Sequence, residues 1–326
     1  MAAPPAMSAG TRPRRRFRRS LGERLAERAL ALVAASAIGA IALILVFVLR
    51  EALPLLWGGH EELALVAPHR YPGYDHPIYM WQPVGYPPKY GVVPLLAGSL
   101  KITGLAMTIS APVSLLAAIY VAEILRPRAR ALIKPVIELL AGVPSVILGF
   151  FALTFLAGAT QDVLGCTYRL NALVAALALS LAVLPVIFTV SEDAIHGVPV
   201  ALREASVALG ARRHQTIARV ILPAALPGIV ASLVLGFGRA IGETMIVLMA
   251  SGNAAVLDAS PTSSARTLTA TIAAELGESP RGGEHWRVLF LLGMILLFIT
   301  WVLDTVCRVV VRRLSRRLDP SAGAWP

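Results

Sequence analysis

Long apolar runs alternate with shorter polar segments along the whole chain. Six of the runs are long enough to cross a bilayer as helices, because its ~30 Å apolar core requires ~20 predominantly apolar residues. The predicted spans are Ala29–Leu49, Ile102–Ala122, Leu139–Thr160, Asn171–Ser191, Ala224–Ala250 and Val288–Val310. Charged residues interrupt the fifth run, and Asp304 and Arg308 lie near the end of the sixth. The pattern predicts an all-α, polytopic membrane protein with six transmembrane helices.

Composition agrees with this prediction. The chain is 56% hydrophobic and only 15% charged, whereas a soluble domain carries about a quarter charged residues. A net charge of +11 would be compatible with nucleic-acid binding, but the arginines cluster beside apolar runs, so membrane topology explains them better. Cys166 and Cys307 lie far apart in the sequence. They predict neither a disulfide framework nor a metal site.

The distribution of Lys and Arg predicts the orientation. Alternate polar segments, including both ends of the chain, hold 21 of these residues on one side and 8 on the other. Because cytoplasmic segments are enriched in Lys and Arg, both termini are expected in the cytoplasm. The predicted organisation is a basic cytoplasmic segment (1–28), a first transmembrane helix (29–49), an external loop (50–101), a membrane core (102–310) with a cytoplasmic loop (192–223), and a basic cytoplasmic tail (311–326).

The first apolar run is too long for a signal-peptide core, so we interpret it as a retained span. The arginines before it are explained most simply as an orientation anchor, with contact to membrane lipid as the alternative and no nucleic-acid partner expected. The external loop at 50–101 is rich in Pro, Gly, Tyr and Trp, which favours turns. Its aromatic residues either rest at the lipid headgroups or form a docking surface for an external protein. The loop Ser251–Arg287 is the second candidate for that surface.

The fifth span contains the charged residues Arg239 and Glu243. A central arginine costs about 2.5–3.5 kcal/mol on insertion scales and is not expected to face lipid. On a continuous helix Glu243 would lie on the same face, four residues on, and the two could pair. The pair is either a structural ion pair between helices or part of a substrate pathway, in which the planar fork of Arg239 would meet an anion.

The polar segment Glu204–Pro223 reads EASVALGARRHQTIARVILP. It resembles the EAA loop of ABC-importer permeases, to which a cytoplasmic ATPase docks, although Ser206 and Val220 replace the usual Ala and Ile. The resemblance implies a short helix ending near Gly210, a turn, and a second helix stopped by Pro223, with Arg203, Arg212 and Arg213 offering polar contacts to the ATPase. The residues assigned to ATPase coupling are Arg203, Glu204, Ala205, Gly210, Leu222 and Pro223.

Further motifs narrow the resemblance to the phosphate-specific ABC-importer permeases, over roughly residues 90–313. They include AAIYVAE (117–123), LLAGVPSVILG (139–149), GRAIGETM (238–245) and TLTATIAAELGE (267–278), the last resembling the C-type permease. The resemblance implies a type I, MetI-like permease fold with both termini inside. It also implies a heterodimer with a related permease, two ATPase subunits and an external phosphate-binding protein, and it assigns Arg239 and Glu243 to the transport pathway.

The sequence contains no GxxxxGK[ST] phosphate-binding loop, so ATP is expected on the partner ATPase. This chain is therefore expected to have no catalytic residue, no metal and no cofactor of its own, and to move phosphate by alternating access. Three alternatives stay open at this point: a permease for another oxyanion such as sulfate or molybdate, a proton- or sodium-driven anion carrier, and a regulatory membrane subunit.

Overall fold

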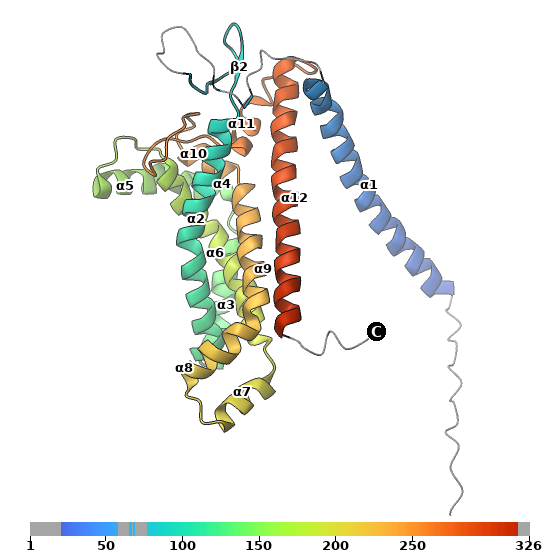
Figure 1. Cartoon of the computed structure of the whole chain (residues 1–326), viewed down its shortest axis with the longest axis vertical. Coiled ribbons are helices and arrows are strands. Elements are labelled where there is room, and N and C mark those ends of the chain that lie inside the picture. Colours follow the sequence, from blue (N-terminus) through green and yellow to red (C-terminus); the bar gives the residue numbers. More distant parts are fainter. Residues whose placement is uncertain (1–20, 58–64, 67, 69–76, 319–326) are drawn as a thin grey trace, which may run out of the picture. The chain divides into compact units, whose positions relative to one another are not determined.

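The computed structural model describes residues 21–57, 65–66, 68 and 77–318 (Figure 1). The first twenty residues of the basic N-terminal segment, parts of the external loop and the last eight residues of the basic tail lie outside the described residues. Within the described part, six helical segments are long and apolar enough to cross a membrane. The prediction of a mostly helical protein with six transmembrane helices is confirmed.

The chain divides into two compact units, residues 1–48 and 49–326. The first unit contains most of helix α1 (Leu21–Trp57), whose side chains are exposed from Leu25 to Phe47. This helix is longer than the predicted span at both ends, because its polar first turns and the segment after Leu49 also adopt helical structure. Its last turns belong to the second unit, where Ala52 and Leu55 are buried.

Helix α6 (Ala172–His196) is the core of the second unit. It packs against α2 (Val93–Ile119) and α9 (Leu222–Ile241), and α9 in turn packs against α12 (Glu284–Leu318) (Figure 1). Small residues permit this close packing of helices. Five alanines of α6 are buried: Ala172, Ala175, Ala176, Ala178 and Ala182. The helix begins at Asn171, whose side-chain oxygen accepts a hydrogen bond from the backbone N–H of Val174 at 3.0 Å.

The third predicted span begins later than expected. Helix α3 (Pro127–Ala141) ends at Gly142, and the membrane-length segment consists of α4 (Ser145–Phe151), a wide π-helical turn η3 (Ala152–Leu156) and α5 (Ala157–Leu164). The cause is Pro144, which disfavours helical geometry at the residue before it. The predicted boundary at Leu139 is therefore wrong, and α3 is a separate amphipathic helix with no buried residue.

One end of the second unit carries a two-stranded hairpin, β1 (Trp81–Gln82) and β2 (Lys89–Tyr90), with α10 (Met245–Ala250) and α11 (Leu268–Glu275) (Figure 1). By the charge count this is the external end. The hairpin base joins a buried cluster that includes Tyr90, Leu268 and Leu292. The ends of the predicted external loop are helical, since α1 runs to Trp57 and α2 begins at Val93.

The opposite, cytoplasmic end carries α7 (Val200–Ala208) and α8 (Arg213–Thr216) (Figure 1). A wide π-helical turn, η4 (Ile217–Ile221), joins α8 directly to α9. The prediction that Pro223 stops this helix is wrong, because Pro223 directly follows the wide turn η4 and the helix continues through it into α9. A second wide turn, η2 (Tyr120–Ile124), ends α2 at the same end of the molecule.

Candidate functional site

The fifth span is broken beside its charged residues. Helix α9 ends at Ile241, and α10 begins only at Met245. The Glu243 carboxylate accepts hydrogen bonds from the backbone N–H groups of Thr244 and Met245, at 3.1 and 3.2 Å, and thereby caps α10. The Glu243 carbonyl accepts one from Thr269 Oγ1 at 3.0 Å. Broken helices within a membrane are tolerated where protein satisfies the freed backbone groups, as it does here.

This break changes the expected relation between Arg239 and Glu243. Among the residues that the structure describes, no ion pair joins the two side chains. The prediction of a same-face pair is therefore wrong, because the helix that would align them ends at Ile241. Arg239 instead lies in the last turn of α9 with an exposed side chain. The partial negative charge of a helix C-terminus favours a cation at this position.

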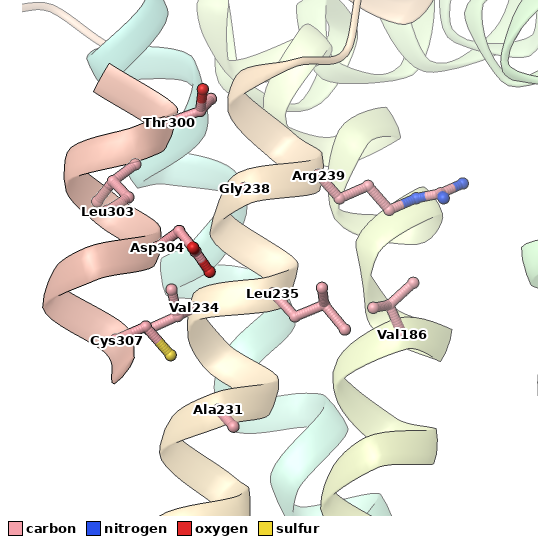
Figure 2. A pocket seen from close by; sticks show the side chains of 10 residues that line it. All are labelled: Val186, Ala231, Val234, Leu235, Gly238, Arg239, Thr300, Leu303, Asp304 and Cys307. Carbon is pink, nitrogen blue, oxygen red and sulfur yellow. The ribbon is translucent and has the colours of Figure 1, made fainter. Parts of the chain in front are cut away.

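Arg239 belongs to an open groove of about 500 Å³ along α9 (Figure 2). Helix α12 forms one wall with Thr300, Leu303, Asp304 and Cys307, and Val186 of α6 lies on the other side. Figure 2 shows Arg239 level with Leu303, near the middle of the membrane-length part of α12. The arginine is thus at mid-membrane depth although it ends its own helix. Its side chain points away from Asp304, which binds Arg308 at 2.6 Å.

The cytoplasmic loop presents an exposed face on α7 and the turn after it. Glu204 and Ala205 are exposed there, and so is the apolar side chain of Leu209 at 89%. Gly210 follows in the left-handed region with φ of +80°, which glycine adopts without a steric penalty. A hollow of about 470 Å³ lies beside this face, between Leu202, Leu209 and Arg219. This face therefore presents a protruding apolar side chain (Leu209), a carboxylate (Glu204) and a recess for contact with another protein.

The same loop has an inward face that the sequence did not reveal. Ser206 is buried, and its hydroxyl hydrogen-bonds that of Thr216 at 3.0 Å, which joins α7 to α8. This contact explains the serine where the resembling family has alanine. Arg203 also points inward, to an ion pair with Glu123, and Arg213 donates to the Glu123 carbonyl. Arg212 is exposed, and Leu222 and Pro223 lie in the first turn of α9.

Two further polar networks escaped sequence reasoning. At the cytoplasmic end, the fully buried Glu192 binds Arg130 and Lys134, which ties α3 to α6. Burial opposes protonation of Lys134, but hydrogen bonds to Asp193 and Glu192 dominate and raise its pKa. This network and the external one described next each join residues far apart in the sequence, so no local sequence pattern predicts either of them.

At the external end, Glu275 accepts hydrogen bonds from Trp81 Nε1 at 3.1 Å and from Arg266 at 2.5 Å. His285 lies 3.3 Å from the same carboxylate and stacks on Tyr90. Burial opposes ionisation of Glu275, but these donors dominate and lower its pKa. Burial and the nearby carboxylates of Glu284 and Glu275 raise the pKa of Tyr90 to about 12, so its hydroxyl stays neutral. The network fastens the hairpin base to α11 and α12.

Comparison with known proteins identifies the family to which the chain belongs. Residues 112–320 match the family model of the binding-protein-dependent transport system inner membrane component, and the chain belongs to this family. It is accordingly a multi-pass protein of the bacterial inner membrane. The matched region contains the α9 groove, the α7–α8 loop and the Glu192 network, whereas the hairpin lies before it.

Individual relatives narrow the family to the phosphate permeases. The chain is 37% identical over 255 residues to the phosphate transport system permease protein PstC 1 of Mycobacterium tuberculosis, covering 71% of this chain and 75% of that protein. It is 30% identical over 298 residues to PstC of Xylella fastidiosa (85% and 89% covered). It is also 38% identical over 233 residues to the probable ABC transporter permease protein YqgH of Bacillus subtilis (72% and 75% covered).

Solved structures confirm the fold. A bacterial alginate ABC transporter in complex with an alginate-bound periplasmic protein matches with a TM-score of 0.57 and 18% identity, covering 89% of this chain and 96% of that chain. The MetNI methionine ABC transporter in an inward-facing conformation matches with a TM-score of 0.51 and 22% identity (69% and 94% covered). These likenesses confirm the predicted MetI-like permease fold.

Proposed function

We propose that this chain is the C-type permease subunit of an ATP-driven importer of inorganic phosphate. The observation that carries the choice of an anion is Arg239, which is exposed in the α9 groove at mid-membrane depth and has no ion pair among the described residues. A guanidinium offers several donors in a planar fork that matches an oxyanion. The choice of phosphate among oxyanions is supported by the phosphate permeases among the relatives.

In this proposal, the α9 groove forms one wall of the path that the anion takes through the membrane. It is open along α9, and large apolar side chains such as Leu235 are exposed beside the charge. A second, homologous permease packed against this face would cover the leucine and enclose the arginine away from lipid. We therefore propose a heterodimer in which the partner permease supplies the opposite wall. Glu243 joins the two sides of the helix break, because its N–H bonds to the Ala240 carbonyl of α9 at 3.2 Å and its carboxylate caps α10. We propose that it thereby positions the end of α9 that carries Arg239.

In this proposal, the energy of ATP hydrolysis is coupled to transport at the cytoplasmic end of the permease. Two ATPase subunits, one for each permease, would dock on the α7–α8 loops through Glu204, Ala205, Leu209 and the turn at Gly210. Their closure on ATP would move these loops and open the pathway outward, and hydrolysis would return it inward. ATP itself is bound by the ATPase chains, so this chain is a transport subunit without catalysis or a cofactor of its own. An external phosphate-binding protein would deliver the substrate.

The hairpin is the proposed external docking point for that binding protein. Val84 and Tyr86 at its tip are almost fully exposed, at 97% and 104% of their reference areas. The base beneath them is fixed by the Trp81–Glu275 hydrogen bonds and by Gly91 N–H to the Met80 carbonyl at 2.9 Å. Tyrosine held at a rigid protruding position is a frequent anchor of protein interfaces.

The decisive experiment is transport by the reconstituted four-chain complex with its binding protein in vesicles. Radiolabelled phosphate should accumulate only when both ATP and the binding protein are present, and an excess of sulfate or molybdate should leave the rate unchanged. Equal competition by sulfate would assign the chain to a broader oxyanion importer. Accumulation without ATP, driven by a proton or sodium gradient, would instead establish a secondary carrier and overturn the proposal.

A further inference from the structure

The cytoplasmic loop is bonded to one residue at the end of α2, Glu123, through Arg203 and Arg213. It lies in η2, where the Leu125 N–H bonds to the Tyr120 carbonyl, five residues back, at 3.0 Å. Its side chain is only 8% exposed. On the other side of the loop, η4 contains the same wide turn, with Leu222 N–H bonded to the Ile217 carbonyl. Wide turns of this kind are rare within helices and are frequent at functional sites.

Arg203 connects this carboxylate to two membrane helices. One guanidinium nitrogen forms the ion pair with Glu123, and the other donates to the Ile195 carbonyl at 2.8 Å, in the last turn of α6. Arg213 donates to the backbone carbonyl of Glu123. The α7–α8 loop is therefore held by charged contacts to the ends of both α2 and α6. Arg203 is bonded to both helix ends, whereas Arg213 reaches the end of α2 and Ser206 reaches α8.

An apolar core lies beneath these contacts and gives them mechanical support. Ala118 and Val121 from the end of α2, Ile195 from α6, and Ile221 from η4 are all nearly inaccessible to solvent. The three helical ends that meet here belong to α2, to α6 and to the segment that carries Arg239. A displacement of α7 can thus reach the pathway through packed, bonded contacts rather than through a flexible loop.

We propose that the Arg203–Glu123 pair is a transmission link that makes α7, α2 and α6 move together when the ATPase closes. Arg203 is then a positioning residue that does not touch the ATPase, although it directly precedes the docking residues Glu204 and Ala205. This proposal rests on the proposed function in one respect, because its transport measurement takes phosphate as the substrate. The link itself concerns how motion passes from loop to helix, and it applies to whichever oxyanion is carried.

The test compares Glu123→Gln and Arg203→Gln with the charge-exchanged double variant E123R/R203E. Both single variants should retain co-purified ATPase and ATP hydrolysis, while phosphate moved per ATP hydrolysed falls about 2- to 30-fold, the range over which single mutations change coupling between sites. The double variant should recover part of the loss. Glu138→Gln, which alters a surface pair with Lys134 at 4.0 Å on the same side of the membrane, is the matched control and should change neither quantity.

A second readout is independent of substrate and of overall stability. Spin labels at the exposed positions Leu116 on α2 and Val200 on α7, in a background with Cys166 and Cys307 replaced by serine, report the distance between the two helices. In the complex with unaltered Glu123, one distance should persist in the nucleotide-free and the vanadate-trapped states. In E123Q the two states should give different or broadened distances.

Three outcomes would overturn the link: unchanged transport stoichiometry in both single variants, equal label distances in E123Q, or loss of the ATPase from R203Q alone. The last result would make Arg203 an ATPase contact. If the unaltered complex hydrolyses ATP yet moves no phosphate, the proposed substrate fails while the label distances still test the link.

Discussion

At the residue scale, a single cation distinguishes the α9 groove from an ordinary helix interface. Arg239 lies level with the middle of α12, yet it is exposed and unpaired among the described side chains. A cation at this depth is costly unless something compensates it. The C-terminal carbonyls of α9 provide part of the compensation, and an oxyanion in transit would provide the rest. The arginine is therefore the residue at which substrate chemistry can be tested most directly.

Replacing Arg239 by glutamine should abolish most phosphate uptake and leave assembly intact. A hydrogen bond to a charged group contributes about 1.5–3 kcal/mol, so the rate should fall roughly 10- to 150-fold. Lysine keeps the charge without the planar fork and should retain an intermediate rate. Uptake in vesicles and co-purification of the partner chains measure the two effects. Arg312→Gln, at an exposed position of α12, is the control, and normal transport by R239Q would remove Arg239 from the pathway.

At the element scale, the sequence predicted what depends on local pattern. The six spans follow from apolar length, although the third begins only at Ser145, after Pro144, and not at Leu139. The break after Ile241 was missed because Gly242 stands in a run of small residues that is equally compatible with a continuous helix. Pro223 was misinterpreted since η4 accommodates it within a helix. The pairing of Glu123 with Arg203, 80 positions apart, depends on tertiary packing and left no local signal.

A substitution at Gly210, in the turn between α7 and α8, should change the backbone conformation of the docking surface and nothing else. Gly210 has φ of +80°, and no atom lies within 4 Å of the position a Cβ would take. Gly210→Ala should therefore cost about 1–2 kcal/mol through left-handed strain and not through collision. Less ATPase should co-purify, whereas Gly210→Asn should be tolerated better. Gly277→Ala, which has equal space and no positive φ, is the matched control. Full ATPase recovery with G210A would show that the docking surface does not depend on this turn.

The hairpin is a second element whose role can be isolated. Tyr86→Ala removes an exposed side chain from its tip and leaves the Trp81–Glu275 anchor in place. If the tip inserts into the binding protein, affinity should weaken by more than about 1 kcal/mol, as for an interface anchor. Titration of the labelled binding protein against the complex in nanodiscs measures the change. Tyr168→Ala, another exposed tyrosine outside the hairpin, serves for comparison, and unchanged binding by Y86A would place the docking surface elsewhere.

At the scale of the whole molecule, the larger compact unit, residues 49–326, has polar networks at its two ends and an apolar middle. The cytoplasmic networks around Glu123 and Glu192 join α7 and α3 to the membrane helices. The external network around Glu275 joins the hairpin to α11 and α12. Between them, α6 is packed through small, fully buried side chains. Such a molecule can pass a movement along α2, α6 and α9 while each end stays attached to its own partner.

The external network also makes stability depend on pH in a defined direction. Because hydrogen bonds and the charge of Arg266 hold the Glu275 pKa below its ordinary value of 4.5 despite burial, the ionised carboxylate stabilises the folded state. That contribution is complete above about pH 4.5 and is lost as the pH falls through the lowered folded pKa. Glu275→Gln should reduce the thermal stability of the complex at neutral pH. The difference in Tm between the two proteins should stay constant down to about pH 5 and shrink below 4.5. Glu278→Gln, an exposed neighbour just beyond α11, controls for the general loss of a carboxylate. A Tm difference that instead widens on acidification would show that Glu275 is not the ionised acceptor that fastens the hairpin.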